Sequence, residues 1–176
     1  MIYPFVDHKV RIEAGNKVIS YGLSSYGYDL RLAKDEFKIF RHVPGTVVDP
    51  KKFNPQNLVD APLHETSEGS FFVIPGHTYA LGFSREKLKI PPDVTVLFIG
   101  KSTYARIGVI ANLTPGEAKW HGHLTLEFSD SSCADCRVYA DEGIVQALFF
   151  RGAPCLTTYG DGKYQNQGAG VVMARV

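Results

Sequence analysis

The chain of 176 residues lacks two things that would place it outside the ordinary globular class: long apolar runs and an excess of one charge. No apolar run approaches the roughly 20 residues of a membrane-spanning helix. Asp7 and Lys9 interrupt the N-terminus before any apolar run begins, so we expect no signal peptide. The formal net charge is +1 without a basic stripe, which disfavours a nucleic-acid groove and leaves a small anionic ligand open. We expect a cytoplasmic protein.

Cysteine is also scarce. The three cysteines are an odd number in a chain without an export signal, so a disulfide framework is not expected. Cys133 and Cys136 nevertheless have the spacing of a metal-binding or redox pair, and His121 and His123 precede them on one face of a predicted strand. Zinc deaminases of nucleobases combine H-x-E with P-C-x-x-C, whereas this chain has H-x-H and places Ser132 before the first cysteine. We therefore interpret the cysteines as small apolar residues at a turn, with a zinc site as the alternative.

Long amphipathic helices are scarce as well. The 17 glycines and 10 prolines separate short apolar runs with an alternating pattern, which is typical of many short strands. A single core is expected at this length, so we predict one all-β domain over residues 1–176, of barrel or sandwich type with a few short helical turns. The predicted strands cover residues 28–32, 36–40, 46–49, 70–74, 78–84, 94–99, 108–113, 123–129, 136–140 and 144–150.

Two polar stretches lie outside these strands. Residues 50–69 predict a long connection over the surface. Residues 152–176 contain too many glycines and polar residues for a core element. A terminal stretch of this kind is disordered by default, and the alternative is a segment that closes over a ligand.

The segment GKST at residues 100–103 has the ending of a phosphate-binding P-loop but lacks its first glycine, because Thr95 occupies that position. The preceding residues VTVLFI predict a strand that runs directly into this segment and leaves no room for a wrapped loop. We therefore reject a P-loop and predict a short helical turn with Ser102 or Thr103 as its N-cap. A helix start beside Lys101 favours anions, although an ordinary capped turn would have the same sequence.

A carboxylate, Glu127, stands in the middle of the predicted strand at residues 123–129. It is either a solvent-facing residue of a half-exposed sheet or a general acid–base group in a semi-buried site. The alternation assigns the side chains of this strand to two faces, with Leu124, Leu126 and Phe128 on one and His123, Thr125, Glu127 and Ser129 on the other.

Several segments taken together resemble the dCTP deaminases, the sister family of the trimeric dUTPases, in the same order along nearly the whole chain. They are SSYGYDLRL (24–32), VVDPKKF (47–53), GKSTYARIG (100–108), LTPGEAKWHGHLTLEFSD (113–130), YADEGIVQALFF (139–150) and YGDGKYQNQ (159–167). The resemblance implies a homotrimer of distorted β-barrel subunits, of the β-clip or dUTPase-like kind, with active sites between neighbouring chains. It also implies hydrolysis of dCTP to dUTP and ammonia, which feeds dUMP and dTMP synthesis, with Mg²⁺ carried on the triphosphate, no metal ligand from protein side chains and no zinc.

The resemblance also assigns roles to residues. Glu127 matches the catalytic glutamate, which would deprotonate water for attack on C4 of cytosine and pass the proton to the ring nitrogen and the departing ammonia. Ser102 and Arg106, four residues apart, are expected to hold the water or the phosphates. Residues 152–176 then form a lid over the triphosphate. The implied substrate-binding residues are Lys101, Ser102, Thr103, Tyr104, Ala105, Arg106, Thr125, Leu126, Gln146, Tyr159, Lys163 and Gln167.

Some features depart from this family. Lys119 and His121 flank Trp120, where acidic residues are common in relatives, and this leaves a preference for modified cytosines open. The alternatives are a bifunctional enzyme that also cleaves the pyrophosphate to give dUMP, and a non-catalytic nucleotide-binding relative. A plain dUTPase is disfavoured because no segment resembles AGVIDxDYxG with its water-activating aspartate. Whether dTTP, which inhibits many relatives, binds as a feedback ligand is left open.

Overall fold

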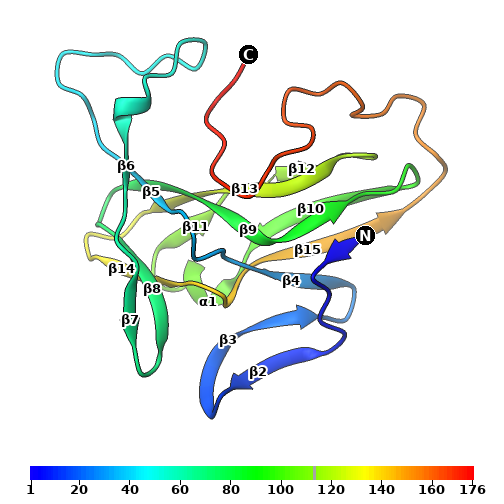
Figure 1. Cartoon of the computed structure of the whole chain (residues 1–176), viewed down its shortest axis with the longest axis horizontal. Coiled ribbons are helices and arrows are strands. Elements are labelled where there is room, and N and C mark those ends of the chain that lie inside the picture. The colour runs from blue at the N-terminus through cyan, green and yellow to red at the C-terminus, as the bar shows by residue number, and fades with distance from the viewer. Residues whose placement is uncertain (113) are drawn as a thin grey trace.

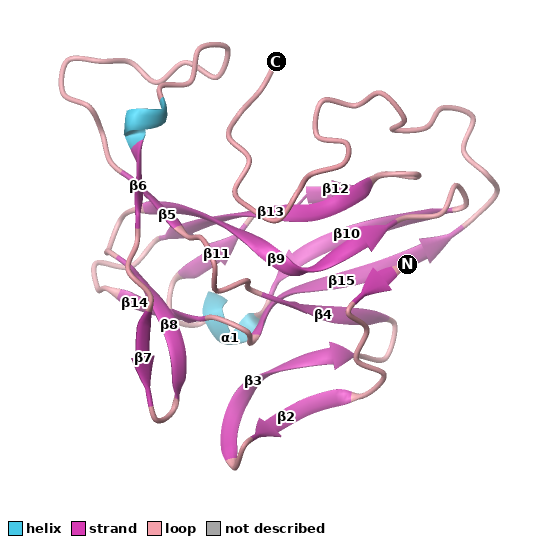
Figure 2. Ribbon diagram, in the orientation of Figure 1, coloured by secondary structure: helices cyan, strands magenta, loops and turns pink. Residues whose placement is uncertain are grey.

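The computed structural model describes residues 1–112 and 114–176, and it is built almost entirely of strands. Figure 2 shows how little helix there is: the single turn α1 (Ser102–Ala105) and the 3-10 segment η1 (Pro55–Asn57). The predicted all-β class with short helical turns is confirmed. None of the described residues belongs to a helix long and apolar enough to cross a membrane.

The strands form three antiparallel sheets (Figure 1). The first has the order β11 (Val109–Ala111), β13 (His121–Asp130), β9 (Tyr79–Lys89), β5 (Lys38–Phe40) and β6 (Leu58–Asp60), with β1 (Ile2–Tyr3) also paired to β9. The second has the order β12 (Thr114–Gly116), β10 (Val94–Gly100), β15 (Gly143–Arg151), β4 (Gly27–Arg31), β3 (Asn16–Leu23) and β2 (Lys9–Glu13). The third is β14 (Cys136–Tyr139), β8 (Gly69–Ile74) and β7 (His64–Thr66).

No sheet closes on itself within the described part of the chain, so the predicted distorted barrel is an open assembly that fits a β-clip fold. The core lies where the sheets face each other. Phe37 stacks on Phe72 with ring centroids 4.8 Å apart and on Phe128 at 5.8 Å. These aromatic rings are almost fully buried, and they join residues far apart in the sequence into one apolar cluster.

Nine of the ten predicted strand positions coincide with strands of the structure. The strand predicted at 46–49 is wrong, because Val47 is 93% exposed and no strand of the described residues pairs with this segment. Leu113, at the end of the strand predicted at 108–113, lies outside the described residues. The connection predicted at 50–69 is also partly wrong, since it contains η1, β6 and β7. Its first turn is ordered by Asn54, whose side chain accepts a hydrogen bond from the Gln56 N–H.

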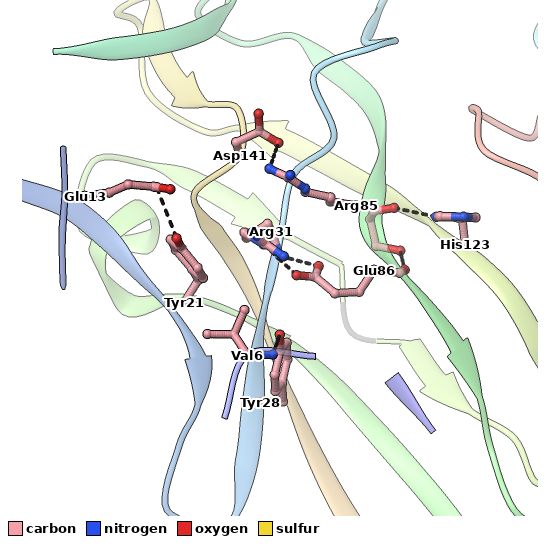
Figure 3. Close-up of polar contacts among 10 residues, drawn as sticks. Val6, Glu13, Tyr21, Tyr28, Arg31, Arg85, Glu86, His123 and Asp141 are labelled. Atoms are coloured by element: carbon pink, nitrogen blue, oxygen red, sulfur yellow. Dashed lines mark hydrogen bonds and ion pairs between the residues drawn. The ribbon is translucent and has the colours of Figure 1, made fainter. Parts of the chain in front are cut away.

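A buried ion pair ties the two large sheets together (Figure 3). Arg31 of β4 donates to Glu86 of β9 through Nε at 2.7 Å and through its backbone N–H at 2.9 Å. Glu86 is fully buried, and burial raises the pKa of its carboxyl group while the bonds from Arg31 oppose that rise. The guanidinium also lies 4.7 Å from the ring centroid of Tyr21. Such a pair holds its geometry because either partner left alone in the core would be costly.

Candidate active site

A cavity of about 660 Å³ opens beside the first sheet. It contains four of the residues singled out by the sequence: Thr125, Glu127, Tyr159 and Gln167. Its walls are mainly apolar and aromatic, which is usual for pockets that enclose a flat ring. The other lining residues are Phe40, Val48, Phe53, Leu58, Tyr79, Leu81, Pro115, Gly116, Glu117, Trp120, Leu124, Tyr164, Val172 and Ala174.

The strand β13 delivers Glu127 to this cavity by simple alternation. Along His121–Asp130, buried and half-buried residues alternate without interruption. Leu126 and Phe128 point into the core, while Thr125 and Glu127 are half-buried. The predicted two faces of this strand are therefore confirmed, and the half-buried position of Glu127 excludes a fully solvated carboxylate.

Two neighbours restrain the Glu127 carboxylate and shape its surroundings. The Asn112 side-chain amide donates to Glu127 Oε2 at 2.5 Å, and the Asn112 backbone N–H donates to the Glu127 carbonyl at 2.9 Å. Tyr79 lies on the adjacent strand β9. Although 38% of Tyr79 is exposed, burial raises the pKa of its phenol to about 12, and the charge of Glu127 adds to that rise. A neutral phenol therefore stands beside a carboxylate held in one orientation.

The C-terminal tail, residues 152–176, folds back along β13 (Figure 1). Five of its residues line the cavity: Tyr159, Tyr164, Gln167, Val172 and Ala174. The Asn166 N–H donates to the His121 carbonyl at 2.8 Å, and the His123 N–H donates to the Gln167 carbonyl at 3.0 Å. Gly122 makes this close approach possible: its φ is +149°, and a Cβ there would lie 2.6 Å from the Gln167 nitrogen.

Side chains reinforce this attachment. The Trp120 indole N–H donates to the Tyr164 carbonyl at 2.9 Å, and Gln165 accepts from the His121 N–H at 2.7 Å. Thr125 donates through its hydroxyl to the Gln167 side-chain carbonyl at 3.2 Å. The tail forms no regular strand, as its composition predicts, yet it is fixed to β13 by a ladder of specific bonds rather than left frayed.

The turn α1 carries the second group of expected residues. The exposed residues Ser102 and Arg106 face each other, with the guanidinium 3.4 Å from the Ser102 hydroxyl oxygen, as their spacing predicts. Thr103 and Ala105 are also exposed. Tyr104 is only 3% exposed and its hydroxyl accepts a hydrogen bond from the Tyr139 N–H, so its side chain belongs to the core.

The N-cap of α1 differs from the prediction. Lys101, rather than Ser102 or Thr103, occupies the N-cap position, and it makes no side-chain capping bond. Its ammonium group instead donates to Asp29 Oδ2 at 2.7 Å and to the Ser20 hydroxyl at 3.3 Å. The expected anion-binding lysine is thus held by a buried carboxylate of its own chain.

Two further expected residues lie outside the cavity lining. Gln146 of β15 is half-buried, and its side-chain amide is 3.4 Å from the Ser24 hydroxyl oxygen. Lys163 of the tail is exposed and donates to the Arg175 carbonyl at 2.7 Å. The residues of α1 are likewise absent from the lining, so one chain brings together Glu127 and the tail but not Glu127 and α1.

The histidines and cysteines do not converge. His121 Nδ1 lies 3.1 Å from the Asn166 side-chain oxygen, and His123 Nδ1 lies 2.9 Å from the Ser84 carbonyl. Cys136 is buried and Cys133 exposed. Among residues 1–112 and 114–176, no group of three or more histidine, cysteine or acidic side chains has the arrangement of a metal site.

Sequence reasoning gave no role to several residues around Glu127. Asn112 and Tyr79 come from neighbouring strands, and only the pairing of β11 and β9 with β13 brings them near. Trp120 and Tyr164 lie in the segments 113–130 and 159–167 that resemble the family, but the sequence assigns neither residue a role. Their aromatic character was a usable signal, because a lone tryptophan and a tyrosine in polar segments often mark a binding wall.

Comparisons with known proteins identify the family of the chain. A family model described as dCTP deaminase-like matches residues 5–152. A dCTP deaminase of Francisella philomiragia is 47% identical over 170 residues, covering 95% of this chain and 87% of that protein.

Two solved structures share the fold. The 2'-deoxycytidine 5'-triphosphate deaminase of Agrobacterium tumefaciens has a TM-score of 0.53 at 17% identity, over 74% of this chain and 40% of that one. The dUTPase of Staphylococcus bacteriophage 80alpha has a TM-score of 0.51 at 11% identity, over 93% and 97% of the two chains. With the family model matching most of its length, the chain belongs to the dCTP deaminase-like family.

Proposed function

We propose that this chain catalyses the hydrolytic deamination of dCTP to dUTP and ammonia. The observation that carries the proposal is a restrained, half-buried carboxylate, Glu127, on the wall of a largely apolar cavity in a chain of the dCTP deaminase-like family. The chemistry requires a general acid–base group at a site from which the bound nucleotide displaces bulk water.

Glu127 acts as base and then as acid. It takes a proton from the attacking water while the water oxygen bonds to C4 of cytosine, and it passes that proton to ring nitrogen N3. The second proton of the water moves to the exocyclic amine. The bond between C4 and the exocyclic nitrogen then breaks, and ammonia leaves. The Asn112 amide keeps the carboxylate oriented through both transfers.

Selectivity for cytosine over uracil follows from hydrogen-bond complementarity. Cytosine presents an amine donor where uracil presents a carbonyl acceptor, so a site arranged for the donor leaves a buried group unpaired when uracil enters. Thr125 and Leu126, next to Glu127 on β13, are the backbone positions proposed to contact the edge of the base. Tyr159 and Gln167 of the tail close the cavity from the other side.

The triphosphate binds to a second group of residues in this proposal. Ser102, Thr103 and Arg106 are exposed on α1 and lie outside the cavity lining of their own chain. We propose that chains associate as a homotrimer, so that α1 of one chain meets the cavity of its neighbour. Arg106 supplies a permanent positive charge to the phosphates. Lys163, Gln146 and the backbone of Tyr104 and Ala105 complete the nucleotide contacts.

Mg²⁺ enters with the triphosphate in this proposal and needs no ligand set from the protein. Mg²⁺ commonly binds through substrate phosphates and keeps several of its waters. When bound, the cation offsets phosphate charge, and the reacting C4 depends on Glu127 alone for proton transfer.

The test is direct. The purified chain is incubated with dCTP and Mg²⁺, with and without a zinc-selective chelator, and the products are separated by chromatography. We expect dUTP and ammonia in equal amounts, at a rate that the chelator does not change. The isosteric variant Glu127→Gln is the matched control, with turnover lowered about 10²- to 10⁴-fold and dCTP binding retained.

Two outcomes would contradict the proposal in different ways. Accumulation of dUMP without free dUTP would indicate a bifunctional enzyme. Absence of turnover with any cytosine nucleotide would leave a nucleotide-binding relative.

A further inference from the structure

The side chain of Lys101 is largely buried against the second sheet, where it contacts Asp29 of β4. Its side chain is 11% exposed and that of Asp29 is 1% exposed, with the ammonium 2.7 Å from Asp29 Oδ2. The Ser20 hydroxyl lies 3.3 Å from the same ammonium. An ammonium that reaches a substrate phosphate would have to give up its 2.7 Å contact with this buried carboxylate, which would keep only Lys9, at 3.7 Å, as a cationic neighbour. Loss of the closer partner from a buried ion pair is costly.

The ion pair spans three strands of the second sheet. Lys101 directly follows β10, Asp29 lies on β4, and β15 runs between these strands. Gln146 of β15 is the cross-strand neighbour of both Ile99 and Asp29, so these side chains share one face of the sheet. The contact between Lys101 and Asp29 therefore lies on the face of the sheet that carries Gln146.

This arrangement sets where α1 begins. Lys101 is the N-cap of α1, and its backbone N–H donates to the Ile144 carbonyl of β15 at 3.3 Å. No side-chain capping bond fixes the first turn. A four-residue turn has little stability of its own, so its position depends on what anchors its first residue.

We propose that Lys101 and Asp29 form a positioning pair that holds α1 and Gln146 in register for dCTP, and that Lys101 is not itself a phosphate ligand. The inference rests on the proposed deaminase function. The pair fixes Lys101, the first residue of the turn, so that Ser102 and Arg106 keep one position relative to the bound substrate. A displacement of about 1 Å at such a site can cost roughly 100-fold in rate.

The two roles for Lys101 predict opposite results for one variant, Asp29→Asn. If Lys101 contacts phosphate, the loss of the Asp29 charge frees it, so kcat is unchanged and KM for dCTP stays the same or falls. If the pair positions α1, Asp29→Asn lowers kcat about as much as Lys101→Met does, by roughly 10- to 100-fold, with KM changed less than threefold. The double variant should then be no worse than either single variant, because the pair acts as one unit.

The chain supplies a matched control. Lys9 approaches the same Asp29 oxygen at 3.7 Å, but its side chain is 36% exposed and it belongs to β2 rather than to the segment that leads into α1. Lys9→Met should change kcat less than twofold. Lys101→Arg keeps the charge and should recover most of the activity lost in Lys101→Met, and it remains informative if Asp29→Asn does not fold.

A readout independent of turnover separates this inference from the proposed function. Hydrogen exchange of the amides of residues 102–106 should quicken in Lys101→Met and Asp29→Asn and stay unchanged in Lys9→Met. If wild-type protein fails to deaminate dCTP while these amides respond as stated, the function fails and the positioning pair stands. Unchanged exchange in Asp29→Asn, or an effect of Lys101→Met on KM alone, overturns the inference.

Discussion

At the scale of single residues, the environment of Glu127 is set by groups that its sequence neighbours do not reveal. Glu127 itself follows from strand alternation, because a carboxylate in an alternating apolar strand has a definite face. Asn112 and Tyr79 do not follow, since strand pairing places them near Glu127. Lys101 was expected to bind anions, but its partner Asp29 lies 72 positions away in the sequence, and local patterns carry no signal over that separation.

The raised pKa of Tyr79 predicts a pH dependence of stability. The folded phenol has a pKa of about 12, whereas an unfolded tyrosine titrates near 10.0, so between these values the folded protein keeps a proton that the unfolded chain has lost. The free energy of unfolding should therefore fall as the pH rises from about 10 towards about 12. Urea denaturation over this range should show a shallower fall in Tyr79→Phe than in wild type.

Tyr26 is a suitable control for this measurement, because it is 88% exposed. Tyr26→Phe should leave the slope unchanged. Glu127→Gln should lower the pKa of Tyr79 in a spectrophotometric titration, because it removes the charge that adds to the rise. A wild-type slope identical to that of Tyr79→Phe would contradict the assignment.

At the scale of elements, strands with clear alternation were predictable and the irregular connections were not. The strands β9, β10, β13 and β15 were all found from their apolar runs. Val47 and Val48 have a high β-propensity, which favours a strand at 46–49. No strand of the described residues lies beside this segment to pair with it, and β-propensity alone does not form a strand. The tail could be predicted as non-core from composition, whereas its attachment to β13 depends on the backbone at Gly122.

Gly122→Ala is predicted to loosen the tail. A Cβ at this position would lie 2.6 Å from the Gln167 nitrogen, and the φ of +149° is unfavourable for alanine, so the bonds of Asn166 and Gln167 to β13 should weaken. Limited proteolysis should cut residues 152–176 faster in this variant, and KM for dCTP should rise about 10-fold or more, which corresponds to about 1.4 kcal/mol.

Gly168→Ala provides the comparison within the tail, since a Cβ there would meet no heavy atom within 4 Å. It should match wild type in both assays. Equal protection of the tail in wild type and Gly122→Ala would show that the tail is held by other contacts.

At the scale of the whole molecule, the fold class can be predicted from the sequence, whereas the contacts that join the sheets cannot. The glycines and prolines separate short alternating apolar runs, and this pattern predicts a β protein. Arg31 and Glu86 join the two large sheets, but in the sequence each looks like an ordinary charged residue of a strand. Their fully buried pairing follows from how β4 and β9 face each other, and a single strand does not contain that information.

The proposed trimer predicts complementation between two inactive variants. Ser102→Ala impairs α1 and Glu127→Gln impairs the cavity, so a site formed between chains can combine the intact parts of each. Chains mixed in equal amounts, unfolded and refolded together should regain about a quarter of wild-type turnover. Half of the α1 turns and half of the cavities are intact in the mixture, so random association combines an intact turn with an intact cavity in about a quarter of the sites. Turnover no higher than that of either variant alone would place the whole site within one chain.

The position of Trp120 has a practical consequence. It is the only tryptophan of the chain, it lines the cavity, and its indole N–H is bonded to the Tyr164 carbonyl of the tail. Its intrinsic fluorescence is thus a built-in optical reporter of tail attachment and cavity occupancy, free of added dyes. Stopped-flow mixing can follow that signal and time the opening of the tail against chemical turnover.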